Sequence, residues 1–250
     1  MSRILVTFDD TDTLDCGRGT GKLARWFEDE LPQDCTLWGV VRQQLLVHPD
    51  VPYTSHNSSA CVVIEVSDAD IMPIIIERAI AHLEKHAVEG SDPGLCVACD
   101  ENPSLGILTS FGERATREVL TQRDAMDAAA AAGVHLSAHG GTNDGIIGAI
   151  AGTGLTIGGW SGRFIEYGGA RRLRDFPNIV PVGELLAEGM LVLPVDRNVE
   201  SPKPDDLVDS LGWLRPRLWG GRAAVPVVRT AVGKWQAIGR SSDKASISGE

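Results

Sequence analysis

Arg3-Ile4-Leu5-Val6-Thr7-Phe8-Asp9-Asp10-Thr11-Asp12 opens the chain with a β-rich, largely apolar run that leads straight into acids. The run over 3–8 predicts a short buried strand. Asp9, Asp10 and Asp12 then place three carboxylates within four residues. Such like charges raise each other's pKa, and a bound cation removes that cost. The loop therefore predicts a Mg²⁺ site at a strand end, where open α/β sheets bind ligands; the alternative is a solvated turn.

A glycine-rich segment, Cys16-Gly17-Arg18-Gly19-Thr20-Gly21-Lys22, follows the acids and opens a helix expected over 22–31. Small residues let backbone N–H groups approach phosphate, and a helix N-terminus favours an anion. The segment is not a P-loop, because Cys16 and Leu23 replace the first glycine and the Ser/Thr of that motif. Lys22 is either a phosphate-binding charge or a solvated first-turn residue. The residues expected at the phosphates are Gly17, Arg18, Gly19, Gly21 and Lys22.

A second glycine-rich region precedes a short helix expected over 144–151. Its spacing differs from G-x-G-x-x-G, so it predicts no dinucleotide fingerprint. A second phosphate or ribose site is one interpretation, and a tight turn with a capping Asn or Asp is the other. The residues assigned to this cofactor-binding site are Gly141, Thr142, Asn143, Asp144 and Gly145.

The remaining patterns predict an α/β (α+β) fold of mixed sheets with flanking helices. Helices are expected over 69–85, with a break or bend near Pro73, and over 113–132, ending at Gly133. Strands are expected over 36–46, around Leu95, and over 60–66, 163–167, 179–182, 191–195 and 223–228. We divide the chain into a nucleotide-binding region over 1–160, a smaller ferredoxin-like or β-rich part over 161–240 and a flexible tail over 241–250.

The bulk composition limits the classes of partner. The net charge of −11 over 250 residues argues against a sequence-independent grip on nucleic acid, which needs a basic surface. The sequence has no apolar run of about 18 residues, so no membrane span is expected. Five cysteines and no signal peptide indicate free thiols and a cytoplasmic location. His82 and His86 have the i, i+4 spacing of metal ligands, but no third ligand is evident, so both are expected on the surface.

Three motifs resemble the kinase-type domain of tRNA-isoleucine agmatinylcytidine synthetase (TiaS). Phe8–Thr13, followed by the run from Gly17 to Ala24, is similar to that family's I-D-D-T-D-S strand end and the helix after it. His48–Asn57 resembles its N-P-x-I-P-[YW]-K-T-R-G-N motif, with Thr54 and His56 in place of Lys and Arg. Gly141–Ile150 resembles its G-R-G-L-I-G-A-L-A segment. The resemblance covers roughly residues 3–160, in the same order as in the family.

The resemblance implies ATP-dependent phosphoryl transfer by a kinase-like domain that is neither a P-loop nor a protein-kinase fold. It assigns metal binding and catalysis to Asp9, Asp10 and Asp12. It also makes Thr20 a phosphate-side residue, at a position of autophosphorylation in the family. No counterpart of the family's OB-type domain and zinc ribbon is expected in this sequence; the ribbon needs cysteines, and none follows Cys99.

The sequence thus leads to an ATP- and Mg²⁺-dependent phosphotransferase, a kinase or ligase, that acts on a small polar molecule. Thr54, His56 and Asn57 are expected to bind this acceptor, in a cleft shared with the acidic loop and the 140–145 loop. No nucleic-acid or membrane partner is expected, and a homodimer is left open. Two alternatives remain: a tRNA-modifying enzyme of the agmatinylcytidine synthetase type, and a non-catalytic nucleotide-binding protein.

Overall fold

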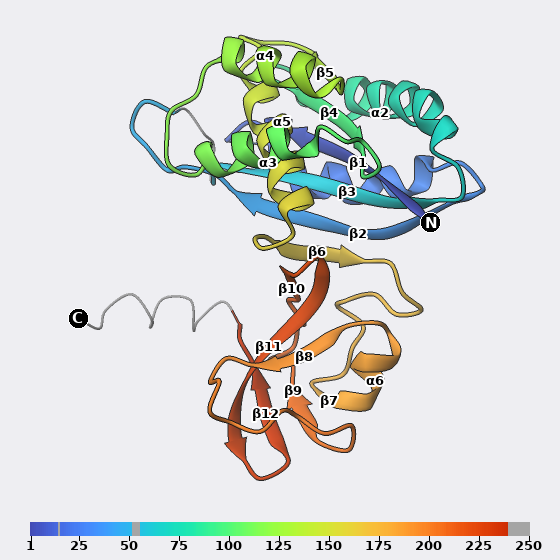
Figure 1. Ribbon diagram of the computed structural model, residues 1–250, viewed down its shortest axis with the longest axis vertical. Helices are drawn as coiled ribbons and strands as arrows, with labels where there is room; N and C mark the ends of the chain where they lie inside the picture. The colour runs from blue at the N-terminus through green and yellow to red at the C-terminus, as the bar shows by residue number, and fades with distance from the viewer. Residues whose placement is uncertain (15, 52–55, 240–250) are drawn as a thin grey trace.

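The computed structural model describes residues 1–14, 16–51 and 56–239. Thr54 and the tail expected over 241–250 lie outside the described residues. A layered α/β part is followed by a smaller β-rich part (Figure 1). The predicted class, mixed sheets with flanking helices, is therefore confirmed.

Six strands of the first part form an antiparallel sheet in the order β5-β4-β1-β3-β2-β6. Their bounds are β1 (Ser2–Asp9), β2 (Cys35–Gln44), β3 (Ser58–Val66), β4 (Gly94–Cys99), β5 (His135–Ala138) and β6 (Arg163–Tyr167). The runs predicted around residues 3–8, 36–46, 60–66 and 163–167 are confirmed as strands. The four-residue β5 was not anticipated from the sequence.

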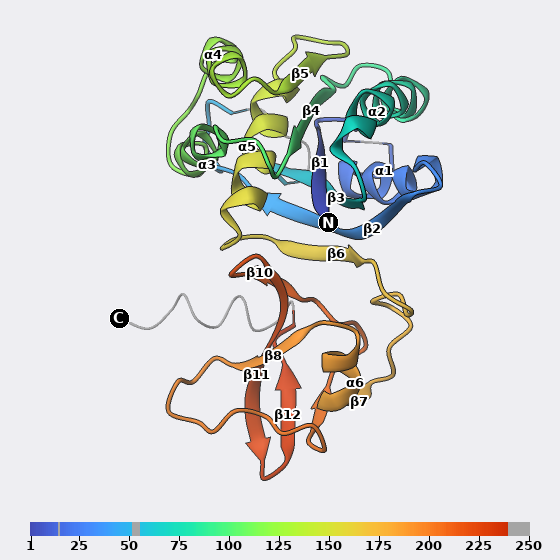
Figure 2. The same cartoon turned by 45° about the vertical axis from the view of Figure 1, so that its right-hand side comes forward.

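Helices cover both faces of this sheet because successive side chains of each strand point to opposite sides. In β1, Ile4, Val6 and Phe8 pack against α1 (Thr20–Trp26), the 3₁₀ helix η1 (Phe27–Glu30) and α2 (Met72–His86). Thr7 faces the other side, where its hydroxyl accepts a hydrogen bond from Thr153 of α5 (Gly145–Gly158) at 2.7 Å. Figure 2 shows α1 and α2 on one side of β1, and α3 (Leu105–Arg114) and α5 on the other.

The single helix predicted over 113–132 is wrong. The chain forms α3, a turn, and then α4 (Gln122–Ala132), which begins at a capping box. Thr121 accepts a hydrogen bond from the Asp124 backbone N–H, and the Asp124 carboxylate accepts one from Thr121 in return. These two hydrogen bonds satisfy the backbone N–H groups of Thr121 and Asp124 at the start of a new helix. The capping box therefore begins α4 at this point, although the helix propensity of the segment favours one continuous helix. Gly133 ends α4 in the left-handed conformation, as predicted (φ 64°).

Three further expectations change. Pro73 neither breaks nor bends its helix, because it lies in the first turn of α2, where a missing N–H costs nothing. The short helix predicted over 144–151 runs on to Gly158 as α5.

His82 is not on the surface: it is 2% exposed, and its ring lies 5.3 Å from Phe27 and 6.0 Å from Phe8, centroid to centroid. Burial lowers the pKa of His82.

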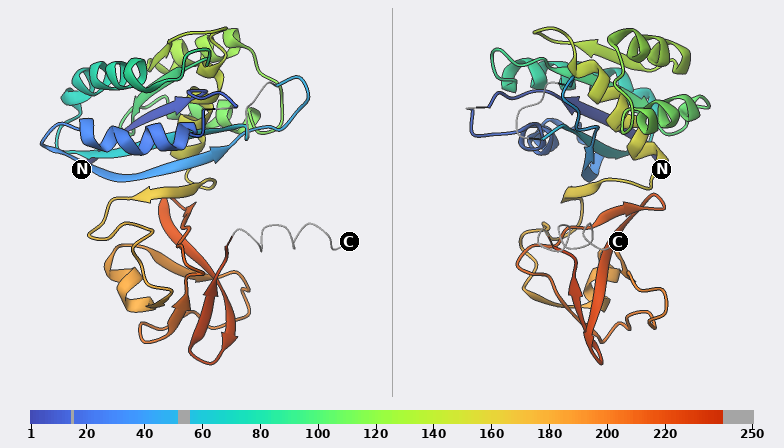
Figure 3. Two further views of the ribbon diagram at one scale, coloured as in Figure 1. Left: turned by 180° about the vertical axis from the view of Figure 1, so that it is seen from behind. Right: turned by 90° about the vertical axis from the view of Figure 1, so that its left-hand side faces the viewer.

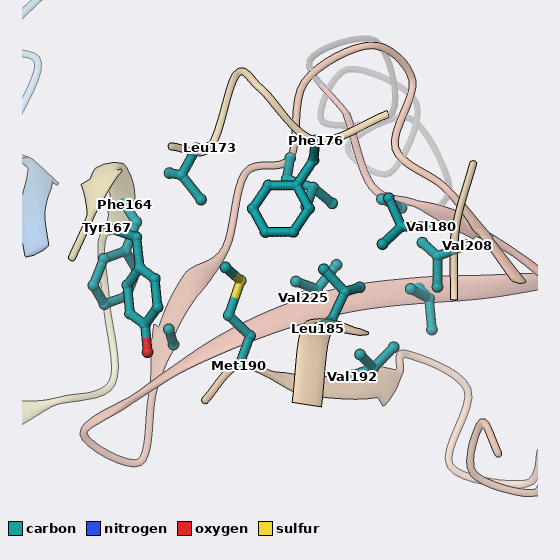
Figure 4. Packing of buried hydrophobic residues seen from close by; sticks show 14 of the residues in the cluster. Phe164, Tyr167, Leu173, Phe176, Val180, Leu185, Met190, Val192, Val208 and Val225 are labelled. Atoms are coloured by element: carbon teal, nitrogen blue, oxygen red, sulfur yellow. The ribbon is translucent and has the colours of Figure 1, made fainter. Parts of the chain in front are cut away.

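The β-rich part has its own hydrophobic core, drawn almost entirely from residues 164–237 (Figure 4). Phe164, Phe176 and Leu185 converge there from three segments. Its elements are β7 (Ile179–Pro181), α6 (Val182–Ala187), β8 (Leu191–Pro194), β9 (Leu207–Asp209), β10 (Arg217–Trp219), β11 (Arg222–Ala231) and β12 (Lys234–Ala237). Both views of Figure 3 show β6 between the two parts. On this basis we propose a division near residue 160.

Within the described residues, no helix combines the length and the apolar character needed to cross a membrane. The remaining helical element of the described residues is η2 (Ala69–Ile71), a short 3₁₀ helix that leads directly into α2.

Candidate functional site

The candidate site forms where four strand ends meet. In the antiparallel register, Asp9 at the end of β1 pairs with Gly94 at the start of β4, and Phe8 pairs with Ala60 near the start of β3. Gln44, at the end of β2, pairs with Ser58 at the start of β3. The ends of β1 and β2 and the starts of β3 and β4 are therefore brought to one edge of the sheet.

A pocket of about 490 Å³ lies at this edge, within the usual size range of ligand sites. Asp9, Asp10 and Asp12 line it together with Thr20, as do His56 and Asn57. Asp144 and Gly145 enter from the start of α5. The three loops that were expected to share one cleft, although they are distant in sequence, thus all contribute to this pocket.

Crowding of acids is the main electrostatic feature of the pocket. Burial, reinforced by the neighbouring charge of Asp10, raises the pKa of Asp9 well above its usual range. Burial and the charges of Asp92, Asp12 and Asp144 raise the pKa of Asp10 to about 6. Asp10 also holds a left-handed backbone conformation (φ 48°), uncommon for a residue with a side chain. The carboxylates are thus held together against their repulsion, an arrangement that favours a cation.

Thr20 lies at the centre of a hydrogen-bond network at the first residue of α1. Its hydroxyl donates to Asp12 Oδ1 at 3.1 Å, and its backbone N–H donates to the same oxygen at 3.1 Å. The Thr11 hydroxyl and backbone N–H both donate to Thr20 Oγ1, at 3.1 and 3.3 Å. Thr20 is 6% exposed. This network fixes the acidic loop to the start of α1 and aligns the Thr20 hydroxyl with a carboxylate that can accept its proton.

The first turn of α5 approaches the acids because its two closest contact positions, Gly145 and Gly148, are glycines. A Cβ at Gly148 would overlap the Asp9 carboxylate, and one at Gly145 would overlap the Asp92 backbone. Only the absence of side chains at these two positions lets the helix N-terminus, with its positive dipole end, reach the acidic loop. The same terminus is suited to a phosphate.

Several residues assigned from the sequence lie away from this pocket. Arg18 Nη2 donates to the His86 carbonyl at 2.7 Å, and Lys22 lies over the Trp26 ring at 5.2 Å. Thr142 donates its hydroxyl to Asp92 at 2.9 Å. Of the described residues predicted as cofactor-binding, Asp144 and Gly145 line the pocket, whereas Gly17, Arg18, Gly19, Gly21, Lys22, Gly141, Thr142 and Asn143 do not; Gly19 and Gly21 line a neighbouring pocket.

Sequence reasoning missed two sets of residues. Asp92, before β4, adds a fourth negative charge near Asp10 and holds the Thr142 loop. An apolar flank of the pocket was also missed; its residues are Leu45, Leu46, Val51, Val119, Leu120 and Ile147. The sequence did contain a signal for the end of the predicted helix near Val119. The pattern Thr121-x-x-Asp124 is a helix-start motif, and it lies inside the helix that was predicted.

A second pocket of about 310 Å³ adjoins the first and has the opposite charge. The two share Asp12, Thr20, His56 and Ser58. Its basic lining consists of Arg25, Arg42, Arg163, Arg174 and Arg215. Burial and the nearby charge of Arg174 lower the pKa of Arg25. Like charges therefore lie close together in this pocket, as the carboxylates do in the acidic one. Arg174 and Arg215 lie over the Trp213 ring at 4.4 and 4.2 Å.

Comparison with solved structures gives this architecture a precedent. A tRNA fluorescent labeling enzyme matches 61% of the chain at 25% identity, with a TM-score of 0.51. TiaS in complex with its isoleucine tRNA and ATP matches 62% at 24% identity (TM-score 0.52). TiaS with the same tRNA, AMPCPP and agmatine matches 75% at 22% identity (TM-score 0.53). The fold is TiaS-like. The match spans only 36%, 36% and 44% of those three chains.

The TiaS-like fold confirms the resemblance and corrects one expectation. A small-molecule acceptor with no nucleic-acid partner is contradicted, because solved structures of this fold hold tRNA. The net charge of −11 is no argument against a nucleic-acid partner, because it averages over the whole surface, whereas five arginines gather in one pocket. No family model matches the chain, and no curated protein matches it in sequence.

The raised pKa of Asp10 predicts a pH dependence for this pocket. As pH falls through about 6, Asp10 takes up a proton that a bound cation would have to displace, so affinity for the Mg²⁺ expected from the sequence should fall. Metal-free stability should change in the opposite sense. Because the folded pKa lies above 3.8, the folded state binds more protons, and stability declines as pH rises from 3.8 towards about 6.

Calorimetric titration of Mg²⁺ with AMPCPP at about pH 5 and about pH 7 measures the first effect, and Asp10→Asn is the control. A wild-type affinity that does not change with pH, or an unchanged pH dependence in Asp10→Asn, would contradict the assignment.

Proposed function

We propose that this chain is an ATP-dependent enzyme that modifies an RNA, of the agmatinylcytidine synthetase type. One observation carries the proposal: an acidic pocket suited to a metal-bound nucleotide adjoins an arginine-lined pocket suited to a phosphodiester backbone, and both reach Thr20. Arginine binds phosphate through a planar, bidentate fork, so a cluster of arginines fits a polyanionic acceptor better than a neutral one.

The acidic pocket supports ATP in two ways. Its apolar flank, which includes Leu46 and Leu120, offers contact area for a base, while the N-terminus of α5 presents its positive dipole end to phosphates. The crowded carboxylates fit Mg²⁺, a hard cation that prefers oxygen ligands. We assign its binding to Asp9, Asp10 and Asp12. When bound, Mg²⁺ would neutralise phosphate charge.

Thr20 links the two pockets. Asp12 Oδ1 accepts a hydrogen bond from the Thr20 hydroxyl at 3.1 Å, so it orients this hydroxyl and is placed to accept its proton. We therefore assign to Thr20 the positioning of the phosphates or, as the resemblance implies, their transient acceptance. His56 lines both pockets and is placed to contact the acceptor. The cytoplasmic location inferred from the free thiols is part of this proposal.

The direct test follows ATP by ³¹P NMR with the full chain, Mg²⁺ and total tRNA. We expect ATP cleavage that depends on RNA. We also expect saturable tRNA binding at about 150 mM salt that is tighter than the ~10⁻⁴ to 10⁻⁶ M of generic association. ATP binding with no turnover under any condition would favour a non-catalytic nucleotide-binding protein. Cleavage that is indifferent to RNA, with no tRNA binding, would reject the proposed acceptor.

Removing one arginine tests the second pocket. Arg174→Gln and Arg215→Gln should each weaken tRNA binding and lower the slope of log affinity against log salt by about 1, since one phosphate contact releases about one counterion. ATP affinity should be unchanged, because neither residue lines the acidic pocket. Arg229→Gln is the matched control, an exposed arginine outside both pockets. An equal loss in all three variants would indicate a diffuse charge effect.

A further inference from the structure

We propose that Glu30, His82 and His86 form a Zn²⁺ site on the helical face formed by η1 and α2. One ligand atom from each residue lies within 4.8 Å of the other two. The histidines are one turn apart on α2, and η1 brings the carboxylate that the sequence alone did not reveal. None of the three lines the acidic or the arginine-lined pocket, so the proposal is independent of the proposed function.

The hydrogen bonding of His82 points to a missing ligand. Its Nε2 lies 3.0 Å from the Leu23 carbonyl oxygen, which can only accept, so Nε2 must carry the proton. That leaves Nδ1 with a lone pair. Nδ1 is buried and has no hydrogen-bond partner among the described residues, in a side chain that is 2% exposed. A buried unpaired nitrogen is costly, and coordination to a metal would satisfy it.

This arrangement is the one that metal-binding histidines adopt. One ring nitrogen donates to a backbone carbonyl, which fixes the tautomer and the ring orientation, and the other faces the ion. The ring of His86 lies 4.6 Å from that of His82, centroid to centroid. Trp26 packs beside His86 at 5.4 Å and partly shields the cluster.

The donor set selects the metal. Two imidazole nitrogens and one carboxylate oxygen suit Zn²⁺, at bond lengths of about 2.0–2.2 Å, with a fourth position for water. Mg²⁺ prefers oxygen ligands alone and is disfavoured here. The ion pair between Lys85 Nζ and Glu30 Oε1, at 3.9 Å, competes for the carboxylate. That pair is largely exposed and therefore weak, so a metal would displace it readily.

The backbones around the site are already tethered. Arg78 donates to the Glu30 carbonyl at 2.8 Å, and Arg18 donates to the His86 carbonyl at 2.7 Å. Just beyond α2, the Val88 N–H donates to the Thr11 carbonyl at 3.0 Å. A bound Zn²⁺ would therefore lock η1 to α2 at the point where α2 supports the acidic loop. Its role is to stiffen that support.

Zn²⁺ titration of the full chain, without nucleotide and against a chromophoric chelator, tests the site. We expect one equivalent that an excess of Mg²⁺ does not displace. Loss of even an outer-shell partner weakens metal binding about 10–100-fold, so His86→Ala and the nearly isosteric Glu30→Gln should each weaken it by at least ~10-fold. His135→Ala, a part-buried histidine on β5, should leave the affinity unchanged. Circular dichroism checks that each variant is folded.

Substitution with Co²⁺ identifies the ligands. Nitrogen and oxygen ligation gives visible d–d bands without thiolate charge transfer, whereas binding at Cys16 or Cys35 would add that band. The proposal is overturned by no Zn²⁺ binding, by equal affinity in His86→Ala, Glu30→Gln and wild type, or by a thiolate band. It is also overturned if Asp9→Asn, rather than these variants, removes the bound Zn²⁺.

Discussion

Replacing Asp9 or Asp12 with asparagine should abolish Mg²⁺-dependent ATP binding and leave the fold intact. Both acids line the pocket, and Asp12 also holds Thr20 through two hydrogen bonds of 3.1 Å. An asparagine keeps the volume but removes the negative charge that would bind the proposed Mg²⁺. We expect turnover to fall about 10²-fold or more, the scale seen when one charge-stabilising group leaves a catalytic site.

Asp9→Asn should at the same time stabilise the metal-free protein at neutral pH. Burial and Asp10 raise the folded pKa of Asp9 above its unfolded value, so its ionised form opposes folding. This penalty grows as pH rises above 3.8, and asparagine removes it. A variant that is more stable yet inactive would separate function from folding.

The measurements are calorimetric titration with Mg²⁺ and AMPCPP, and urea unfolding at about pH 4 and about pH 7. Asp196→Asn is the control, an exposed acid that lines neither pocket. Its nucleotide affinity should match wild type. Wild-type affinity in both Asp9→Asn and Asp12→Asn would remove the metal assignment.

Gly148→Ala should have an effect of similar size through packing. The added Cβ would overlap the Asp9 carboxylate and come within 3.1 Å of Leu45 Cδ1. Neither α5 nor β1 can yield easily, because glycines at 145 and 152 already hold the helix in close contact with the sheet region. Overpacking of this kind costs about 1–3 kcal/mol. The shift imposed on Asp9 should also abolish nucleotide binding.

Gly106→Ala is the matched control for Gly148→Ala. It too lies in a helix, α3, but a Cβ there meets nothing within 4 Å. Alanine should therefore stabilise the protein by about 0.5–1 kcal/mol through helix propensity. Urea unfolding and AMPCPP titration measure both variants. If Gly148→Ala binds the nucleotide as wild type does, the close approach of α5 is not needed for the site.

The features that could be predicted from the sequence are local ones. The strand over 3–8 and the acids after it are adjacent residues, and their order alone places carboxylates at a strand end. Gly133 was predicted to end its helix because glycine is the residue that most easily adopts the left-handed backbone conformation found at helix ends. The break at Thr121 was missed because an alanine run outweighed a capping box in the pattern, although the capping box decides the structure.

Features that depend on contacts across the chain could not be predicted in this way. Asp92 joins the acids only because β4 pairs with β1 in a register that sets Gly94 opposite Asp9. Glu30 meets His82 and His86 only because η1 and α2 pack on the same face of the sheet.

By itself, the sequence determined a TiaS-like α/β fold and an acidic loop at a strand end, since neighbouring residues carry both. Only the tertiary structure shows the feature that supports the proposed RNA partner, a pocket lined by five arginines. Arginines from residue 25 to residue 215 have no common spacing, and an overall charge of −11 hides them. Antiparallel pairing and the packing of the two parts gather them beside Thr20. Charge acts over distances in space rather than along the chain, so only the folded arrangement creates a pocket suited to a polyanion.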